Sequence, residues 1–326
     1  MSVPYGEEDA IMKGSPVLEL SEPTVESTGQ TTVEKVTGRT SHQILDNLAI
    51  EEPIEIQLTY GPSSSRATRS ILVTMRTPGN DFDLAAGFLM TEGVIRDAND
   101  IDQIAYAGQL SNEEQSSPQT MSALKLGSRQ NIVRVDLATD IAVSLATLQR
   151  NFYTTSSCGI CGKASLLALR AVCPPRAASS FRMKAHVLYS LPSRLRASQG
   201  VFDRTGGLQG AGLFDSNVKL LALREDVGRH NAVDKLIGYE SLAGRTPLRD
   251  RLLLPSGRAS FELLQKALMG GVPMVAAVGV PSSLAVQVAK EFDIALVGFL
   301  RDDHFNIYHG RNRIGGYTRT SIGATE

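Results

Sequence analysis

Two cysteines separated by two residues are the side chains of this sequence best suited to chemistry. Cys158 and Cys161 stand in TTSSCGICGKASLLALR, just before or within the first turn of an expected helix. The helix N-terminus and the neighbouring Lys163 both favour the thiolate, which is the nucleophilic form of cysteine. Gly159 and Gly162 leave the sulfur atoms uncrowded. The spacing indicates a reactive thiol pair, and the competing interpretation is two small buried hydrophobic residues.

The sequence lacks the further ligands that a zinc site at this cysteine pair would need. A zinc site needs about four ligands, or three and a water molecule, and the sequence has no second CxxC. Zinc deaminases also require a His-x-Glu, and none of the five histidines is followed by that pattern. We therefore expect no metal site.

The phosphate-binding and dinucleotide-binding motifs also fail. A P-loop requires glycine where Ser157 stands and Ser or Thr where Ala164 stands. Gly207, Gly210 and Gly212 do not form GxGxxG, which leaves a nicotinamide cofactor little support. A thioredoxin-like dithiol oxidoreductase stays open, because CxxC suits reversible dithiol chemistry.

Composition excludes several classes of protein. The 326 residues include 33 Lys+Arg and 34 Asp+Glu, a net charge of −1, so no field of one sign attracts nucleic acid or anionic lipid. The chain has no Trp and only 6% aromatic residues, which argues against base-stacking surfaces. No apolar run approaches the ~20 residues of a membrane span, and the N-terminus is acidic. We expect a soluble cytoplasmic protein without nucleic-acid or membrane partners.

The pattern along the chain predicts an extension and two domains. Residues 1–50 lack sustained periodicity and are expected to be a flexible N-terminal extension without chemistry. Residues 51–150 are expected to form a mixed α+β domain. Its predicted elements are a hairpin of strands 54–60 and 70–76, a helix capped by Asp81 or Asp83 and ended by Gly93, strands 101–106 and 132–137, and a loop over 110–130.

Residues 151–326 are expected to form an α/β domain. Its predicted elements are a helix after Cys161 that ends before Pro174-Pro175, strands 218–223, 251–254, 274–278 and 294–298, and helices 230–239, 259–269 and 282–291. This alternation predicts a largely parallel sheet covered on both faces, with ligands bound beyond the carboxyl ends of its strands. The polar segments expected at that edge are 224–231, 256–260, 279–283 and 299–304.

Charged residues near this edge permit two interpretations. Asp226 precedes Gly228 and is expected to cap the next helix, whereas Asp234 and Lys235 suit either a solvated face or a site. Arg229 and His230 are cations at a helix N-terminus, a position that favours them only if an anion binds there. Ser256 is a helix cap or, with Arg258, part of a phosphate cradle.

Five segments in preserved order resemble the FdhD/NarQ family of formate dehydrogenase accessory sulfurtransferases. They are RTPGNDFDLAAGFLMTEGVI at 76–95, SSCGICGKAS at 156–165, REDVGRHNAVDKLIG at 224–238, GRASFELLQKALMGGVPMVAAVGVPSSLAVQVA at 257–289 and VGFLRDDHFNIY at 297–308. The resemblance implies that a cysteine persulfide receives sulfur from a cysteine desulfurase. It implies transfer to the bis-guanine-dinucleotide molybdenum or tungsten cofactor of formate dehydrogenase, bound as a substrate with no permanent cofactor. It further implies a homodimer and a C-terminal domain with a cytidine-deaminase-like three-layer sheet.

The resemblance also assigns roles to particular residues. Cys158 corresponds to the persulfide carrier and Cys161 to its partner. The residues expected to bind the cofactor are Phe299, Leu300, Arg301, Asp302, Asp303, His304, Thr205, Gly206, Gly207, Gln209, Arg229, His230, Ser256 and Arg258. Gln209 departs from the family pattern TGGxHxA, where histidine is usual, and so replaces a group able to relay protons with one that only forms hydrogen bonds.

The sequence therefore predicts a sulfur carrier in which Cys158 forms the persulfide and Cys161 assists or resolves it. A non-catalytic cofactor-binding chaperone and a dithiol oxidoreductase are the alternatives. The metal, the dehydrogenase served and the effect of Gln209 are left open.

Overall fold

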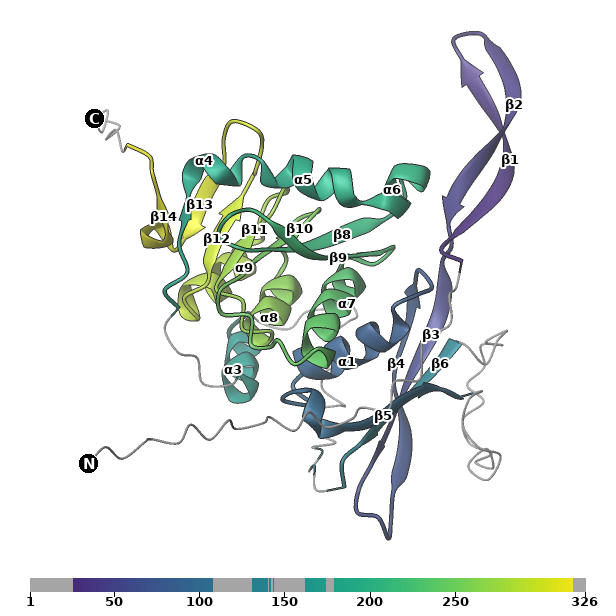
Figure 1. The fold of residues 1–326 in the computed structure, drawn as a ribbon, viewed down its shortest axis with the longest axis vertical. Coiled ribbons are helices and arrows are strands. Elements are labelled where there is room, and N and C mark those ends of the chain that lie inside the picture. The colour runs from purple at the N-terminus through teal and green to yellow at the C-terminus, as the bar shows by residue number, and fades with distance from the viewer. Residues whose placement is uncertain are drawn as a thin grey trace, which may run out of the picture.

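The computed structural model describes residues 26–107, 131–139, 141, 143, 162–173 and 179–318. Two larger sheets organise this part of the chain (Figure 1). Short 3-10 turns at η1 (Ala98–Asp100) and η5 (Arg311–Arg313) and a two-stranded pairing of β7 (Met183–Lys184) with β14 (Ile314–Gly315) complete the connections.

The larger sheet has six strands in the order β13-β12-β11-β10-β8-β9. These are β8 (Gln209–Phe214), β9 (Leu220–Asp226), β10 (Leu252–Pro255), β11 (Met274–Ala276), β12 (Ala295–Gly298) and β13 (Asn306–His309). Only β10, β11 and β12 run parallel to one another, and the other three pairings are antiparallel. The prediction of a largely parallel sheet was wrong outside these three strands. Short connections join β8 to β9 and β12 to β13, and such connections allow antiparallel pairing only.

Helices cover both faces of this sheet in three layers, as an α/β fold requires. One face packs against α7 (Arg229–Leu242), α8 (Phe261–Met269) and α9 (Ser283–Glu291) through Leu253, Val275 and Leu296. The other packs against α4 (Ala185–Leu188) and α5 (Leu191–Ser198), which lead into α6 (Gly200–Thr205). Alternate residues of each strand face opposite layers, so both faces of the strands are apolar.

The second sheet has the strand order β4-β3-β6-β5. The expected hairpin is β3 (Glu52–Tyr60) with β4 (Ala67–Arg76), and β5 (Ile101–Tyr106) and β6 (Ile132–Leu137) also lie where predicted. Helix α1 (Asp81–Thr91) begins after Asn80, which adopts a left-handed conformation and caps nothing with its side chain. The predicted capping by Asp81 or Asp83 was wrong, because both carboxylates bind arginines instead. Gly93 follows the helix end with φ +71°, as expected of a terminator.

The two sheets share one hydrophobic core. Ile56 and Val135 of the four-stranded sheet, Leu89 of α1 and Leu236 of α7 are all fully buried members of the same cluster. The predicted boundary near residue 150 therefore separates two sheets, but the interior is continuous across it. The described residues contain no helix long and apolar enough to cross a membrane.

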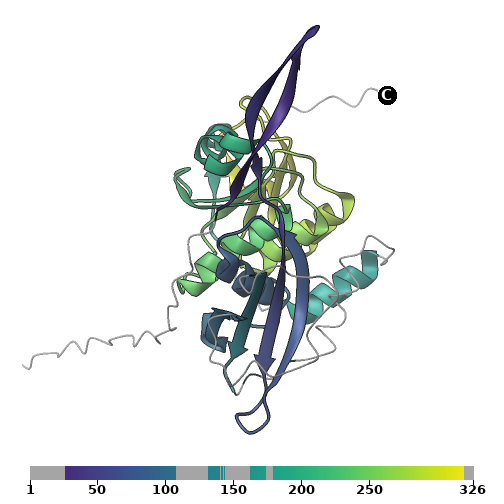
Figure 2. The ribbon, with the colours of Figure 1, turned by 90° about the vertical axis from the view of Figure 1, so that its right-hand side faces the viewer.

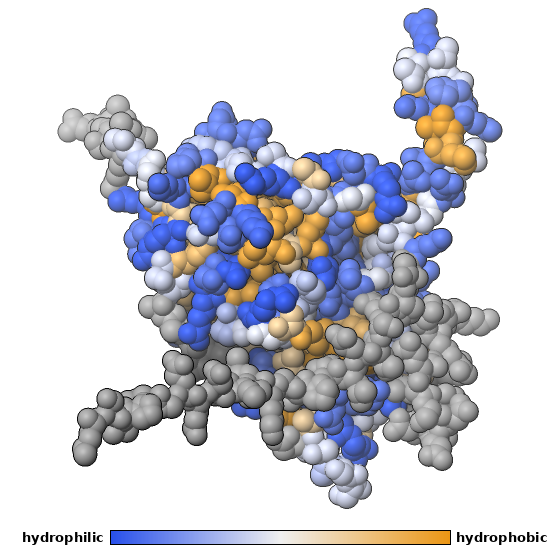
Figure 3. Space-filling view, in the orientation of Figure 1, coloured by the Kyte–Doolittle hydropathy of each residue, from blue (hydrophilic) through white to orange (hydrophobic). Residues whose placement is uncertain are grey.

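Residues 28–49 correct the prediction of a flexible extension over residues 1–50. They form a long hairpin of β1 (Thr28–Thr37) and β2 (Thr40–Ala49), which projects from the body in both ribbon views (Figures 1 and 2). Apolar and polar residues are mixed on both of its faces, so the hydrophobic alternation that marks a half-buried strand is missing. Val36 and Leu45 are 68% and 69% exposed, and Figure 3 shows apolar surface partway along the hairpin. Residues 1–25 lie outside the described residues.

Candidate functional site

The loops at the edge of the six-stranded sheet where ligand binding is predicted are joined by a continuous run of contacts. The N-terminal end of β8 meets the carboxyl end of β10, where the Gly210 amide donates to Ser256 Oγ at 2.9 Å and the Ser256 amide to the Gly210 carbonyl at 2.8 Å. The Gly279 amide donates to the Gly257 carbonyl at 3.0 Å, and the Phe299 amide to the Gly279 carbonyl at 3.2 Å. The loops after β10, β11 and β12 thus hold one another in place at this edge. Ser256 belongs to this framework and is not the helix cap.

Gln209 faces the loop after β10. Its Oε1 lies 3.1 Å from the position that a Cβ on Gly257 would occupy, so this glycine makes room for the glutamine. The residue that departs from the family pattern is therefore beside Ser256 and Gly257, at the centre of the edge. An amide there can donate and accept hydrogen bonds but holds no proton for transfer.

Two arginines of the predicted set lie on neighbouring loops of the edge. The Arg258 Cγ sits 2.8 Å from where a Cβ on Gly279 would be, so the arginine stem crosses that glycine. Arg301 Nη1 donates to the Val278 carbonyl at 2.6 Å and to the Leu300 carbonyl at 2.9 Å. Both arginine side chains are exposed, and each lies against the backbone of a loop at this edge. Two guanidinium groups placed in this way are suited to binding an anion.

The segment Phe299–His304 forms a tight turn between β12 and β13. Phe299 has φ +53° and is 36% exposed, whereas Leu300 is fully buried. A left-handed conformation is uncommon for a bulky residue and costs on the order of 1–3 kcal/mol, and such strain gathers at functional sites. Asp302, Asp303 and His304 are exposed, and His304 Nδ1 lies 2.6 Å from Asp303 Oδ1.

Thr205, Gly206 and Gly207 have a local structural role. Gly206, at φ +66°, is the C-cap of α6, and Thr205 Oγ1 donates to the Val201 carbonyl and accepts from the Gly207 amide. A Cβ on Gly207 would lie 3.4 Å from the Ala49 Cβ at the base of the hairpin. Their backbone turns the chain toward Gln209, and the Thr205 hydroxyl is occupied within the turn.

Arg229 and His230 open α7, whose N-cap is Gly228. His230 Nε2 lies 3.4 Å from Ser260 Oγ at the start of α8 and 3.9 Å from Glu262 Oε2. Burial, followed by the repulsion of the Lys266 ammonium, lowers the pKa of His230 to about 4. The expectation of two cations at this helix N-terminus was wrong for His230, which is neutral at pH 7 and so compatible with the helix dipole without an anion.

Cys158 and Cys161 lie outside the described residues. The helix predicted after them is α3 (Gly162–Val172), which is anchored to the core through buried Leu169. Arg170 of this helix forms an ion pair with Glu291 at the end of α9. The structure thus fixes the segment that immediately follows the cysteine pair.

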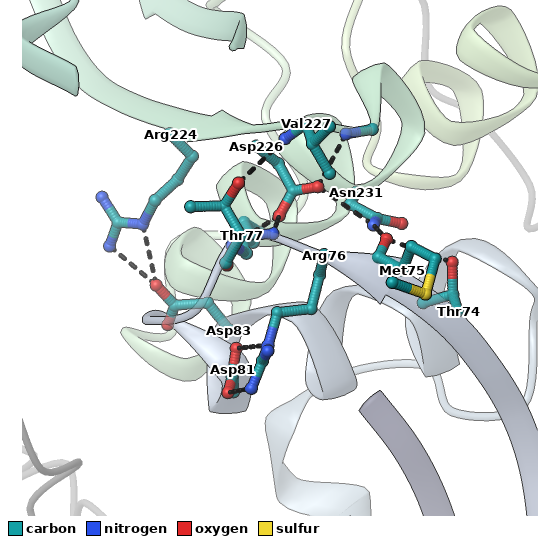
Figure 4. A network of polar contacts seen from close by, with 12 residues as sticks. Thr74, Met75, Arg76, Thr77, Asp81, Asp83, Arg224, Asp226, Val227 and Asn231 are labelled. Atoms are coloured by element: carbon teal, nitrogen blue, oxygen red, sulfur yellow. Dashed lines mark hydrogen bonds and ion pairs between the residues drawn. The ribbon is translucent and has the colours of Figure 1, made fainter. Parts of the chain in front are cut away.

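Sequence reasoning missed the part played by Asp226, which joins the two sheets. The side chain is fully buried, and its Oδ2 accepts from the Thr77 amide at 3.1 Å (Figure 4). The same oxygen pairs with Lys235 Nζ at 2.7 Å. Lys235 also donates to the Thr77 carbonyl at 2.7 Å, and Asn231 Nδ2 links Asp226 to the Met75 carbonyl. Asp226 is therefore neither a solvated charge nor a simple helix cap.

One further ion pair lies within the segment 76–95, and another connects that segment to 224–238. Arg76 forms a bidentate pair with Asp81 at 3.0 and 2.9 Å, and Arg224 Nη2 lies 2.7 Å from Asp83 Oδ2. Burial raises the pKa of Asp83, although the facing arginine opposes that shift. The two segments that resemble the family, 76–95 and 224–238, therefore pack against each other in this structure.

A second buried cluster lies where α1, α7 and α8 meet. Lys266 Nζ is 2.8 Å from Asp234 Oδ2 and 3.3 Å from Glu92 Oε1, and Thr91 Oγ1 donates to Asp234 Oδ1 at 2.7 Å. Burial raises the pKa of Asp234, and for Lys266 the nearby carboxylates outweigh burial and raise the pKa. Both Asp234 and Lys235 are buried, so the solvated face, one of the two interpretations left open for them, was wrong.

Comparison with known proteins agrees with this architecture and with the motifs of the sequence. A protein of Streptomyces avermitilis named sulfur carrier protein FdhD is 48% identical over 276 residues, which cover 82% of this chain and 89% of that protein. One of the same name from Sulfurisphaera tokodaii is 36% identical over 269 residues, covering 82% and 92% of the two chains. The crystal structure of a candidate formate dehydrogenase accessory protein from Desulfotalea psychrophila superposes with a TM-score of 0.64 at 21% identity, over 89% of this chain and all of the other.

The family model described as FdhD/NarQ matches residues 49–315, from the start of the four-stranded sheet to β14. The match includes the cysteine pair, the sheet edge and both halves of the buried network. The chain belongs to the FdhD/NarQ family.

Proposed function

We propose that this protein is a sulfur carrier in the maturation of a formate dehydrogenase, with Cys158 as the residue that carries the sulfur. The observation that supports this proposal most directly is an intact cysteine motif, CGICG at 158–162, inside a family match that extends over residues 49–315. Its relatives at 36–48% identity bear the name sulfur carrier protein.

The position of the pair before α3 supplies a physical reason for reactivity. In the sequence, Cys161 directly precedes Gly162, the first residue of the helix, and Cys158 comes three residues before Cys161. The N-terminal amides of a helix favour the thiolate of a cysteine placed close to them. The Cys158 thiolate attacks the outer sulfur of a persulfide on a cysteine desulfurase. A new S–S bond forms on Cys158, and the desulfurase cysteine leaves as its thiolate.

Cys161 then supplies the electrons that release the sulfur. Its thiolate attacks the inner sulfur of the Cys158 persulfide, which forms a Cys158–Cys161 disulfide and expels the outer sulfur as hydrosulfide. The acceptor in this proposal is the bis-guanine-dinucleotide molybdenum cofactor, a substrate of the protein rather than a resident group. The same sulfur-transfer steps apply if the cofactor contains tungsten in place of molybdenum.

The edge of the six-stranded sheet is the proposed binding surface for the guanine dinucleotide. Arg258 and Arg301 provide cations for the phosphates, and Ser256, Gly257 and Gln209 offer hydrogen-bonding groups between them. The strained and exposed Phe299 is positioned to contact a base.

The proposal includes further expectations carried by the family resemblance. They are a homodimer, a cytoplasmic location, a desulfurase as donor, a formate dehydrogenase as recipient, and a C-terminal unit related to cytidine deaminases. A cofactor-binding chaperone without sulfur chemistry is the second candidate, since the edge residues converge in the described part of the chain whether or not the thiols react.

Intact-protein mass spectrometry tests the carrier mechanism. After incubation with a cysteine desulfurase and cysteine, the protein should gain about 32 Da, one sulfur atom, as expected for a persulfide. Cys158→Ala should abolish the gain and Cys161→Ala should retain it. An active desulfurase that leaves the wild-type mass unchanged would favour the chaperone.

Activation of the dehydrogenase separates the two candidates further. Cys158→Ala should eliminate activation if the protein carries sulfur, whereas a chaperone would lose activation only with edge variants such as Arg301→Ala. Normal activation by Cys158→Ala would overturn the carrier assignment.

A further inference from the structure

The upper layer of the molecule carries a concentration of positive charge that the proposed chemistry leaves unused. Five cations and one carboxylate are exposed along the segment that contains α4, α5 and α6. They are Arg182, Lys184, Arg194, Arg196 and Arg204, with Asp203 as the acid. We call this surface the basic face. The whole chain has a net charge of −1, so the basic face is a local excess.

Of the cations near α6, Arg196 is paired with a carboxylate of the described residues and Arg204 is not. Arg196 pairs with Asp203 at 3.0 Å and lies over the Phe202 ring at 4.4 Å. Arg204 Nε donates to the Gly200 carbonyl at 3.3 Å, which satisfies a nitrogen without neutralising its charge. Glu225 is held by the amides of Val201 and Phe202 at the start of α6. At the α4 end, the contact between Tyr189 and Phe305 brings the acidic turn with Asp302 and Asp303 into the neighbourhood.

The basic face leads to the base of the hairpin. The helices α4, α5 and α6 follow one another across the upper side of the six-stranded sheet, with α6 nearest the hairpin (Figure 1). Helix α6 contacts β2, and Gly207 lies against Ala49, the last residue of β2. Thr28 pairs with Ala49, so the chain enters β1 at the same place.

The segment that enters there has the opposite charge. Residues 1–25 contain five acidic residues, Glu7, Glu8, Asp9, Glu19 and Glu22, and one basic residue, Lys13. Glu22 is six residues before Thr28, and six residues of extended chain reach at most about 20 Å. Helices α5 and α6 together measure roughly 20 Å along their axes, so Glu19 and Glu22 can reach the cations of both.

We propose that residues 1–25 dock on the basic face as an intramolecular acidic tail, with Glu19 and Glu22 against Arg194 and Arg204. Exposed ion pairs contribute about 0.2–1 kcal/mol each, so several are needed to hold the tail and salt releases it. The tail is a better occupant than a separate protein because its tether ends beside the face and raises its effective concentration.

Docking at this place would regulate the sheet edge, a consequence that rests on the proposed function. Arg204 directly precedes the turn Thr205–Gly207, which leads into Gln209. A docked tail places negative charge beside the surface proposed for the phosphates of the guanine dinucleotide. It therefore competes with that ligand electrostatically, and the phosphate-bearing ligand displaces it.

Zero-length cross-linking of the full chain tests the docking itself. A carbodiimide joins a carboxylate to an amine with loss of water, and it reports pairs already in contact. Arg204→Lys retains the charge and adds an amine at the α6 end, while Lys184 serves the α4 end. Lys290 of α9 is the control, because it is exposed and α9 covers the opposite face of the sheet.

The expected products are intramolecular cross-links from the lysine introduced by Arg204→Lys to Glu19 or Glu22. They should disappear at roughly 0.5 M salt, where the Debye length is about 4 Å. They should also disappear when the five tail acids are changed to Gln or Asn. Cross-links no more frequent than those of Lys290, or links only between isotopically labelled and unlabelled chains, would overturn intramolecular docking.

Titration with GDP tests the regulatory consequence separately. At low salt the variant with five neutralised tail acids should bind GDP roughly two- to tenfold more tightly than the parent chain, because no docked fraction must be displaced. Equal affinities together with the expected cross-links would overturn the competition. Absence of GDP binding in both chains, again with the cross-links, would instead refute the nucleotide-binding part of the proposed function.

Discussion

His230 shows how burial changes the role of a residue that looks like a cation in the sequence. It stands at the start of α7, between Ser260 and the buried Lys266 cluster, and its pKa falls to about 4 because the charged form is poorly solvated there. Near neutral pH it offers the sheet edge a neutral imidazole. It therefore suits hydrogen bonding to a ligand, and Arg229 supplies the positive charge at this position.

The lowered pKa predicts a particular dependence of stability on pH. Between pH 6.5 and about 4 the unfolded histidine binds a proton and the folded one does not, so His230 makes the free energy of unfolding fall as the pH falls through that window. His230→Gln should flatten this decline in urea unfolding measured from pH 7 to pH 4. The exposed His186 is the matched control, and His186→Gln should leave the profile as it is. Identical profiles for His230→Gln and the parent chain would contradict the prediction.

Lys235 makes two buried contacts where the two sheets meet, with Asp226 and with the Thr77 carbonyl. Its side chain and that of Asp226 are 1% and 0% exposed, so removal of the ammonium leaves a buried carboxylate without its counter-charge. Lys235→Met should lower the free energy of unfolding by about 3–5 kcal/mol, the usual cost of breaking a buried ion pair. Lys290→Met, at an exposed site on α9, should stay within about 0.5 kcal/mol of the parent chain in the same urea titration. A loss below about 1 kcal/mol for Lys235→Met would show that Asp226 is satisfied without it.

At the scale of elements, the backbones of α1 and α7 approach each other closely where the two helices cross. A Cβ on Gly87 would lie 1.9 Å from the Asp234 carbonyl oxygen, and one on Gly238 would lie 1.9 Å from that of Asp83. Each glycine thus contacts the backbone of the opposite helix. Ion pairs of Asp83, Asp226 and Asp234 tie the two helices to β9 and α8, and Thr91 of α1 donates directly to Asp234 of α7.

Alanine at the crossing should separate the helices. Gly87→Ala or Gly238→Ala is expected to cost about 3 kcal/mol or more, at the upper end of overpacking because backbone atoms must move. Gly200→Ala is the control, since nothing lies within 4 Å of a Cβ at that position in α6 and alanine favours helix. Thermal unfolding of the three variants checks this, and a Gly238→Ala protein as stable as the Gly200→Ala protein would refute the tight crossing.

At the scale of the whole molecule, the continuous core couples the two sheets. Buried residues of β3, β6, α1, α7 and α8 belong to one cluster, so neither sheet retains its interior when the other unfolds. We therefore expect the described part of the chain to unfold as one cooperative unit.

Scanning calorimetry checks this expectation. The parent chain should show one transition whose calorimetric and van't Hoff enthalpies agree, and Lys235→Met should shift the entire transition to lower temperature. Two resolved transitions, of which Lys235→Met moves only one, would show that the sheets are separate folding units.

The elements that sequence periodicity predicted correctly are those with a clear apolar pattern. Strands 54–60, 101–106 and 132–137 and the helices of α7, α8 and α9 lie where expected, because alternation or a 3.6-residue period marks their buried faces. The β1–β2 hairpin escaped because both of its faces are mixed. Strand β8 is antiparallel because it pairs with β10 in that direction. The apolar period of a strand does not indicate which other strand it will pair with.

The sequence by itself determined the elements that have a clear apolar period and the cysteine motif, since these follow from local pattern and from motif order. Only the tertiary structure decided which charges are buried and what they bind. Asp226 accepts from Thr77, 149 residues away, and Lys235 donates to Thr77 across 158 residues. Such pairs have no local signal, because a charge is stabilised in the interior only by whichever distant group the fold brings to it.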